Sequence, residues 1–177
     1  MCIRDSLGWI KILSPIYSST YFQQKTKMSE FYSRLEWKRD HPDFELKTFN
    51  RSHRIHFPNG ALLEGSSAPD YSGDPEKNNP EQLFVASLSS CHMLTFLAVA
   101  AIGKWKVESY EDDAVGYLEK NETGKMSMNR VVLRPSVRFS GEGPNQEELS
   151  ILHEKAHRGC FIASSVNTEV RIEPPSV

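Results

Sequence analysis

A long apolar segment, residues 83–102, constrains the fold of this chain more than any other feature. Its sequence, "LFVASLSSCHMLTFLAVAAI", places apolar or small side chains on every face of a helix. Before it, Asn79 is suited to cap the helix, Pro80 to occupy its first position and Glu81 to complement its dipole. Gly103 is a stop signal. We therefore expect one continuous helix between these signals, buried on all sides.

Strand patterns precede and follow this helix. Short runs that mix aromatic, β-branched and polar residues predict strands before it, and two longer runs joined by the turn "NETGK" predict strands after it. A second helix is expected within residues 141–160, where Leu149, Leu152 and Ala156 share one face. Pro135 indicates an edge position or a bulge. The expected strands are residues 31–39, 44–50, 53–57, 61–67, 105–120, 126–140 and 166–174. This order of elements predicts an α+β domain.

The first residues differ from the rest of the chain. Residues 1–27 make a poor signal peptide, because Lys11 and Pro15 interrupt their short apolar patch. The opening "MCIRDS" resembles a translated adapter of sequencing libraries, so we predict a non-native or disordered leader. Residues 28–177, starting at Met28, would then form a single domain of ordinary size.

Composition narrows the expected partners and compartment. A formal net charge of −2 gives no electrostatic reason to expect nucleic acid or an anionic membrane surface as partner. We also expect no membrane span, because no segment approaches the roughly 18 to 20 unbroken apolar residues that one needs. Three cysteines are too few for a secreted disulfide scaffold. We therefore expect a cytoplasmic protein, in which a cysteine pair more often carries chemistry than structure.

A helix that is apolar all round needs cover on every side. A single antiparallel sheet can cover one side, and the second predicted helix can cover another. We infer that a second copy of the chain covers the remainder, in a homodimer with the central helices inside.

Two cysteines of the predicted domain have several possible roles. Cys91, in the apolar helix, and Cys160, after the second helix, could both be buried core residues, since free cysteine is among the most buried residue types. A metal site is a weaker alternative, based on the H-x3-H-x2-C spacing of His153, His157 and Cys160. Cys91 and His92 would complete its ligand set. A cysteine hydrolase with a histidine base is less favoured still, because the sequence marks no oxyanion hole.

The segments around these cysteines resemble a known family. Residues 78–97, "NNPEQLFVASLSSCHMLTFL", and residues 156–170, "AHRGCFIASSVNTEV", resemble the two motifs of the OsmC/Ohr family of thiol peroxidases. The resemblance covers about residues 31–174. It implies an OsmC-like fold, with antiparallel sheets wrapped around a long buried central helix in an intertwined homodimer. This agrees with the burial argument, which does not depend on it.

The resemblance also implies roles for individual residues. Cys91 matches the peroxidatic cysteine of the family and Cys160 the resolving cysteine. Glu81 matches a glutamate that holds a catalytic arginine. Arg51 fits the position of that arginine, with Arg54 as the alternative. Without the resemblance, Arg51 would be interpreted as a solvated strand charge and Glu81 as a helix-dipole residue.

The implied activity is reduction of organic or lipid hydroperoxides in peroxide stress defence. An external dithiol, in some members a lipoylated protein, would restore the thiols, and no metal, haem or flavin cofactor is needed. Two departures mark an atypical branch: His92 stands where Ohr-type members have an aromatic residue, and Phe161 where they have proline. The competing hypothesis is a non-catalytic protein of the same fold that binds a small hydrophobic ligand.

The spacing of Glu81 and Cys91 raises a geometric problem. Ten residues of helix correspond to about 15 Å of rise, so the two side chains cannot meet along one unbroken helix. Either the helix breaks around residues 87–90, or Glu81 serves the Cys91 of the other subunit.

Overall fold

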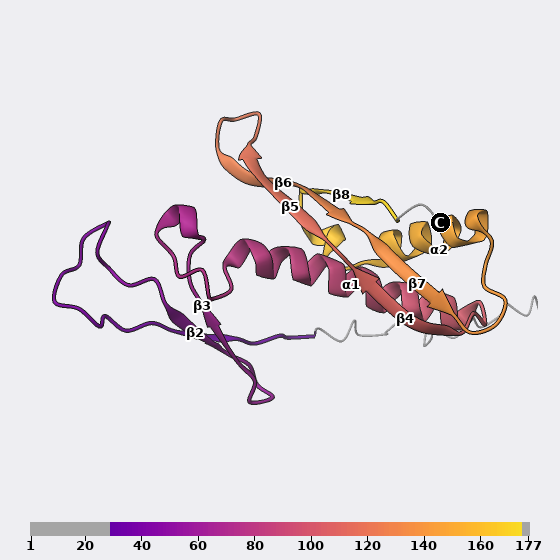
Figure 1. Cartoon of the computed structure of the whole chain (residues 1–177), viewed down its shortest axis with the longest axis horizontal. Helices are drawn as coiled ribbons and strands as arrows, with labels where there is room; N and C mark the ends of the chain where they lie inside the picture. Colours follow the sequence, from indigo (N-terminus) through magenta and orange to yellow (C-terminus); the bar gives the residue numbers. More distant parts are fainter. Residues whose placement is uncertain (1–28, 175–177) are drawn as a thin grey trace, which may run out of the picture. The chain divides into compact units, whose positions relative to one another are not determined.

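The computed structural model describes residues 29–174 (Figure 1). The predictions for residues 1–27, including Cys2, therefore lie outside the described residues. Within them the chain forms two α-helices, eight strands and two short 3-10 helices. Their order is β1 (Arg34–Glu36), β2 (His53–His56), β3 (Leu62–Gly65), η1 (Pro69–Tyr71), α1 (Pro80–Ile102), β4 (Val107–Asp112), β5 (Val115–Lys120), β6 (Met126–Leu133), β7 (Pro135–Phe139), α2 (Gln146–Gly159), η2 (Ala163–Ser165) and β8 (Glu169–Ile172).

Helix α1 begins and ends where the sequence predicts. The Asn79 side chain accepts a hydrogen bond from the backbone N–H of Gln82, and the Gln82 side chain accepts one from the backbone N–H of Asn79. This reciprocal capping box satisfies two N–H groups that have no partner within the helix. Pro80 occupies the first turn and Gly103 follows the last residue. All 23 residues are helical, so α1 is unbroken.

The strands form three small sheets. Strands β1, β2 and β3 pair antiparallel, as do β4 with β7 and β5 with β6. The α+β prediction is confirmed, but β8 joins β6 in parallel, which the sequence did not indicate. Residues 44–50 are not the strand we expected. The backbone N–H groups of Thr48 and Phe49 both bond to the Glu45 carbonyl and close a turn there.

Each long strand predicted after α1 is two strands in the structure. The first divides between β4 and β5, and the second divides at Arg134, between β6 and β7. The carboxylate of Asp112 accepts the backbone N–H of Arg134 over 2.6 Å, in place of a strand partner. Pro135, the next residue, has no N–H to offer a ladder. The hydrogen bond from Arg134 and the missing N–H of Pro135 together explain why pairing passes from one sheet to another at this point.

The core forms around one stripe of α1. The buried residues of this helix lie four positions apart: Leu88, His92, Phe96 and Ala100. Phe96 packs with Leu152 and Ala156 of α2, the face that the sequence predicted for the second helix. Leu88 packs with Val131 of β6. One chain therefore covers α1 on the side that faces α2, β4, β5 and β6.

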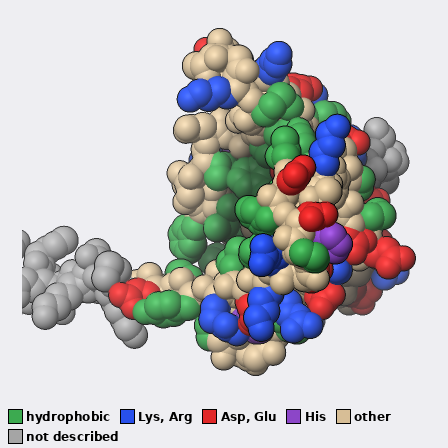
Figure 2. Space-filling model, turned by 90° about the vertical axis from the view of Figure 1, so that its left-hand side faces the viewer, with side chains coloured by type: hydrophobic (Ala, Val, Ile, Leu, Met, Phe, Trp, Pro, Cys, Tyr) green, Lys and Arg blue, Asp and Glu red, His purple; other side chains and the backbone are tan. Residues whose placement is uncertain are grey.

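The remaining faces of α1 are open in a single chain. Leu94 is 61% exposed and Ile102 is 84% exposed, so one chain covers only part of this helix, as the sequence predicts, and its burial by a second copy stays a prediction. Figure 2 shows hydrophobic side chains gathered in a hollow on one face of the molecule. An apolar surface of this kind commonly marks an interaction site.

Helix α1 is also long and apolar enough to cross a membrane, by length and composition alone. Its most apolar 18-residue window has a mean hydropathy of 1.8, and 22% of that window is buried. The expectation that no segment approaches a membrane span is therefore wrong. Because α1 packs against α2 and three strands, we interpret it as the central helix of the fold.

Replacing Asn79 with alanine should lower the free energy of unfolding by about 1 kcal/mol, because the N–H of Gln82 loses its acceptor. Urea denaturation followed by circular dichroism measures the change. Asn79→Ser keeps a side-chain oxygen and should stay close to the wild type. An equal loss of stability in both variants would show that Asn79 does not act through capping.

Candidate functional site

Two cysteines from distant parts of the chain lie side by side. Cys91 is near the middle of α1, and Cys160 is the C-cap residue of α2, 69 positions later (160 minus 91). Both are free thiols. Two successive backbone amides of one turn reach their sulfurs, Ile162 N–H that of Cys91 and Ala163 N–H that of Cys160. The structure thus brings together the two residues that the sequence predicted as a reactive pair.

Small residues let the end of α2 reach α1 at this point. A Cβ atom on Gly159 would lie 3.0 Å from the Cγ2 of Thr95, closer than ordinary van der Waals contact. Ala156, one turn earlier on α2, is fully buried. A larger side chain at either position would push α2 away from α1 and separate the sulfurs.

Backbone amides of the turn after α2 also contact the two sulfurs. The N–H of Ile162 donates to Cys91 Sγ over 3.5 Å, and the N–H of Ala163 donates to Cys160 Sγ over 3.4 Å. No residue type in the sequence indicates these contacts, because a backbone amide is the same in every residue except proline.

The two thiols differ in burial. Cys160 is 1% exposed, whereas Cys91 is only partly buried. Burial, and then the interaction with the Cys91 side chain, raise the pKa of the Cys160 thiol to about 11. Cys160 is therefore protonated at neutral pH, and Cys91 is the thiol that a molecule in solution reaches more easily.

A buried histidine pair lies next to the cysteines. His92, which follows Cys91, places its Nε2 atom 3.2 Å from His153 Nδ1, in a hydrogen bond between α1 and α2. The ring of Phe96 stacks on His153, with 4.5 Å between ring centroids. Burial is the main reason that the pKa of each histidine falls to about 4. The pair is therefore uncharged at neutral pH, in agreement with its apolar surroundings.

The metal site that we considered from sequence has no structural support. Among residues 29–174, no group of three or more His, Cys, Asp or Glu side chains could hold a metal ion. His153 contacts His92 and Phe96 instead of joining His157 and Cys160 in a ligand set.

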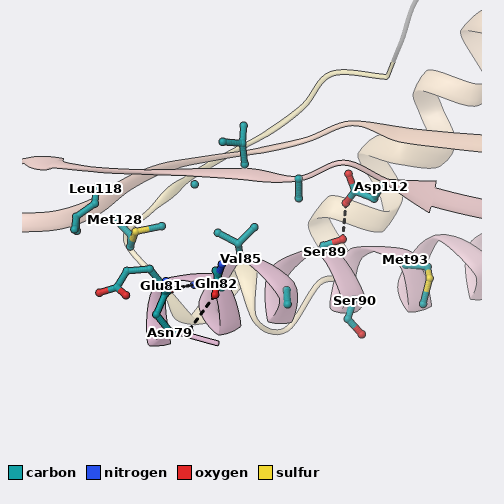
Figure 3. Close-up of a pocket in the computed structure, with 14 residues that line it drawn as sticks. Asn79, Glu81, Gln82, Val85, Ser89, Ser90, Met93, Asp112, Leu118 and Met128 are labelled. Atoms are coloured by element: carbon teal, nitrogen blue, oxygen red, sulfur yellow. Dashed lines mark hydrogen bonds between the residues drawn. The ribbon is translucent and has the colours of Figure 1, made fainter. Parts of the chain in front are cut away.

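Glu81 lies away from the cysteines of its own chain. It lines a cleft of about 710 Å³ between α1 and the strands β5 and β6 (Figure 3). In the described part of the chain, its Oε2 atom is buried without a hydrogen-bond partner. Because α1 is continuous, Glu81 and Cys91 are separated by about 15 Å of helical rise. The alternative of a helix break around residues 87–90 is therefore wrong.

Neither candidate arginine reaches the cysteines within one chain. Arg51 donates to two backbone carbonyls of its own loop, and its guanidinium carbon lies 4.1 Å from the centroid of the Phe49 ring. Arg54 pairs with Glu64 of the neighbouring strand. Over residues 29–174, neither arginine forms a hydrogen bond or an ion pair with Cys91.

Comparison with known proteins identifies the family. Residues 73–174 match the family model described as OsmC-like protein, so the chain belongs to the OsmC-like family. An OsmC-like protein of unknown function from Vibrio cholerae O1 biovar eltor is 44% identical, with a TM-score of 0.80 over 84% of this chain and 100% of that one.

Two more distant structures share the fold. An organic hydroperoxide resistance protein from Elizabethkingia anophelis is 21% identical, with a TM-score of 0.67 over 86% of this chain and 99% of that one. The organic hydroperoxide resistance protein OsmC from Legionella pneumophila is 20% identical, with a TM-score of 0.65 over 84% and 98%. The predicted OsmC-like fold is therefore confirmed.

Acid should destabilise the protein through the histidine pair. Because the folded-state pKa of His92 and His153 is about 4, below the ordinary 6.5, the unfolded chain binds protons first as the pH falls. Above pH 6.5 the two uncharged histidines make their full contribution to the free energy of unfolding. This contribution is lost progressively as the pH falls towards 4. The neighbouring His157 opposes a charge on His92, and Asp112 partly favours it. At about 1.4 kcal/mol per pKa unit, the expected loss is on the order of 3 kcal/mol per histidine.

Urea denaturation between pH 7 and pH 4.5 tests this expectation. The double variant His92→Phe/His153→Leu lacks both groups, so its stability should depend less on pH over this range. His41→Gln, which changes an exposed histidine, should behave like the wild type. A double variant as acid-sensitive as the wild type would exclude the pair as the cause.

Proposed function

We propose that this protein is a thiol-dependent peroxidase that reduces organic hydroperoxides, with Cys91 as the peroxidatic and Cys160 as the resolving cysteine. The observation that carries the proposal is that one turn places adjacent backbone amides on both free thiols, which the packing of α2 on α1 brings near each other. The fold shared with the organic hydroperoxide resistance proteins from Elizabethkingia and Legionella supports the substrate class.

The first step takes place at Cys91, the more accessible thiol. Its thiolate attacks one peroxide oxygen, so that an S–O bond forms and the O–O bond breaks. The alkoxide leaves and takes up a proton to become an alcohol. Cys91 is oxidised by two electrons to a sulfenic acid, and the hydroperoxide is reduced by two.

The second step uses Cys160. Its sulfur attacks the sulfenic sulfur of Cys91, so that the S–S bond forms and the S–O bond breaks. The departing hydroxide takes the thiol proton of Cys160 and leaves as water. An external dithiol then reduces the disulfide and is itself oxidised to a disulfide. The reducing cytoplasm would supply such a dithiol, and a lipoylated protein is one candidate.

In this proposal, an arginine of a second chain supplies the positive charge beside Cys91. A free thiol is only a few per cent thiolate at neutral pH, and a nearby guanidinium favours the charged form. Within residues 29–174, Arg51 bonds to backbone carbonyls of its own loop and not to Cys91, and the Oε2 atom of Glu81 has no hydrogen-bond partner. A homodimer in which Arg51 and Glu81 of one subunit complete the Cys91 site of the other accounts for both facts. The open apolar faces of α1 would form its interface.

A second candidate function is supported by the cleft beside α1. Its volume of about 710 Å³ and apolar lining residues, such as Val85, Met93 and Leu118, suit a small hydrophobic ligand. Neither cysteine lines this cleft. If the protein is such a binding protein, its thiols are redox-inert.

One equivalent of cumene hydroperoxide per chain should remove two titratable thiols, because Cys91 is oxidised and Cys160 then closes the disulfide. A thiol titration with and without peroxide measures this. No loss of thiols would exclude the peroxidase and favour the ligand-binding protein.

Cys91→Ser should abolish turnover, whereas Cys160→Ser should react once and accumulate sulfenic or sulfinic acid. Equal turnover in the two variants would contradict their assigned roles.

Mixing two inactive homodimers should restore activity if the site is shared. Cys91→Ser and Arg51→Ala chains are each expected to be inactive alone. After subunit exchange, half of the dimers are mixed and each has one intact site of two, so roughly a quarter of the wild-type activity returns. Peroxide consumption before and after exchange measures it. Inactive purified heterodimers would place Arg51 beside the Cys91 of its own chain.

A further inference from the structure

The turn that follows α2 contacts the reactive sulfur through its backbone. Helix α2 ends at Gly159, Cys160 caps it, and the chain coils again into η2. Within this turn, Ser164 N–H bonds to the carbonyl of Cys160 and Ser165 N–H to that of Ile162. The two preceding amides, those of Ile162 and Ala163, are thereby left to face the sulfurs of Cys91 and Cys160.

The contact from Ile162 is well placed to act on the charge of Cys91. A hydrogen bond strengthens when its acceptor is ionised, so an N–H donor favours a thiolate over a thiol. The donor is part of a backbone turn held by two hydrogen bonds, and it needs no side-chain ordering. It also belongs to the same chain as Cys91, in contrast to the arginine proposed above.

We propose that the backbone N–H of Ile162 is a catalytic hydrogen-bond donor that stabilises the Cys91 thiolate, so that the segment carrying the resolving cysteine also activates the peroxidatic one. This inference rests on the proposed function for its biological meaning. The contact itself is independent of it, since it acts on Cys91 whether or not a peroxide is the substrate. The same turn thus serves both steps of the proposed reaction. If it moves away from α1, the activation of Cys91 and its resolution by Cys160 are lost together.

Proline at position 162 removes this one donor. Ile162 has φ of −68° and ψ of −42°, and proline fixes φ near −65°, so the residue keeps its conformation while its N–H disappears. Ile162→Ala is the matched control, because it removes the side chain and keeps the N–H. In both variants Cys2 and Cys160 are replaced by serine, so that Cys91 is the remaining thiol.

The readout is the rate of alkylation of Cys91 by iodoacetamide as a function of pH, followed by mass spectrometry. We expect the proline variant to react roughly tenfold more slowly at pH 7, with the midpoint of its pH profile raised by about one unit, as the loss of a hydrogen bond to a charged group predicts. Its rate at about pH 11, well above the ordinary thiol pKa of about 8.5, should approach that of the alanine variant. Identical pH profiles for the two variants would overturn the proposal.

A backbone ester provides a second test that avoids proline's restriction of the preceding residue. Cys160 is a natural ligation site, so residues 160–177 can be joined as a synthetic peptide with an ester in place of the amide at Ile162. The ligated all-amide protein is its control. A raised profile midpoint for Cys91 in the ester protein supports the donor role, and an unchanged midpoint contradicts it. Since alkylation requires no peroxide, these results hold even if the thiol titration excludes the peroxidase.

Discussion

The packing of the C-terminal end of α2 on the middle of α1 is the contact on which the candidate site depends. Phe96, Leu152 and Ala156 fill the space between the helices, and Gly159 permits the closest approach. Cys160 is one residue beyond this contact, so its sulfur is positioned by core packing rather than by a flexible loop. The proposed redox chemistry of the two cysteines thus depends on the packing of the core.

The parts of the fold that the sequence predicts are those fixed by local chemistry. The bounds of α1 follow from Asn79, Pro80 and Gly103, which act within one turn of the helix. The division of the later strands depends on a contact between Asp112 and Arg134, 22 positions apart, and no local pattern shows it. The cysteine pair was predictable only through its motifs. Its backbone donors were not, because an amide has no residue-type signal.

The histidine pair shows how polar side chains are accommodated in the core between α1 and α2. An imidazole at position 92 occupies a buried site and requires a polar partner, which His153 provides across the helix interface. The sequence showed both residues, and we first considered His153 as a metal ligand because of its spacing from His157. The direction in which the His153 side chain points, from α2 towards α1, decides between these two interpretations. The spacing of residues along α2 does not reveal that direction.

The difference in burial between the two thiols imposes an order on the proposed chemistry. Cys160 is almost inaccessible and its pKa is raised to about 11, so it is a poor first nucleophile at neutral pH. That burial does not prevent it from resolving a sulfenic acid, since its target is already in contact and the leaving hydroxide can accept its proton. Cys91 is partly exposed, although each sulfur accepts a hydrogen bond from a backbone N–H of the same turn. In the proposed reaction, a peroxide therefore meets Cys91 first, and Cys160 reacts only after Cys91 has been oxidised.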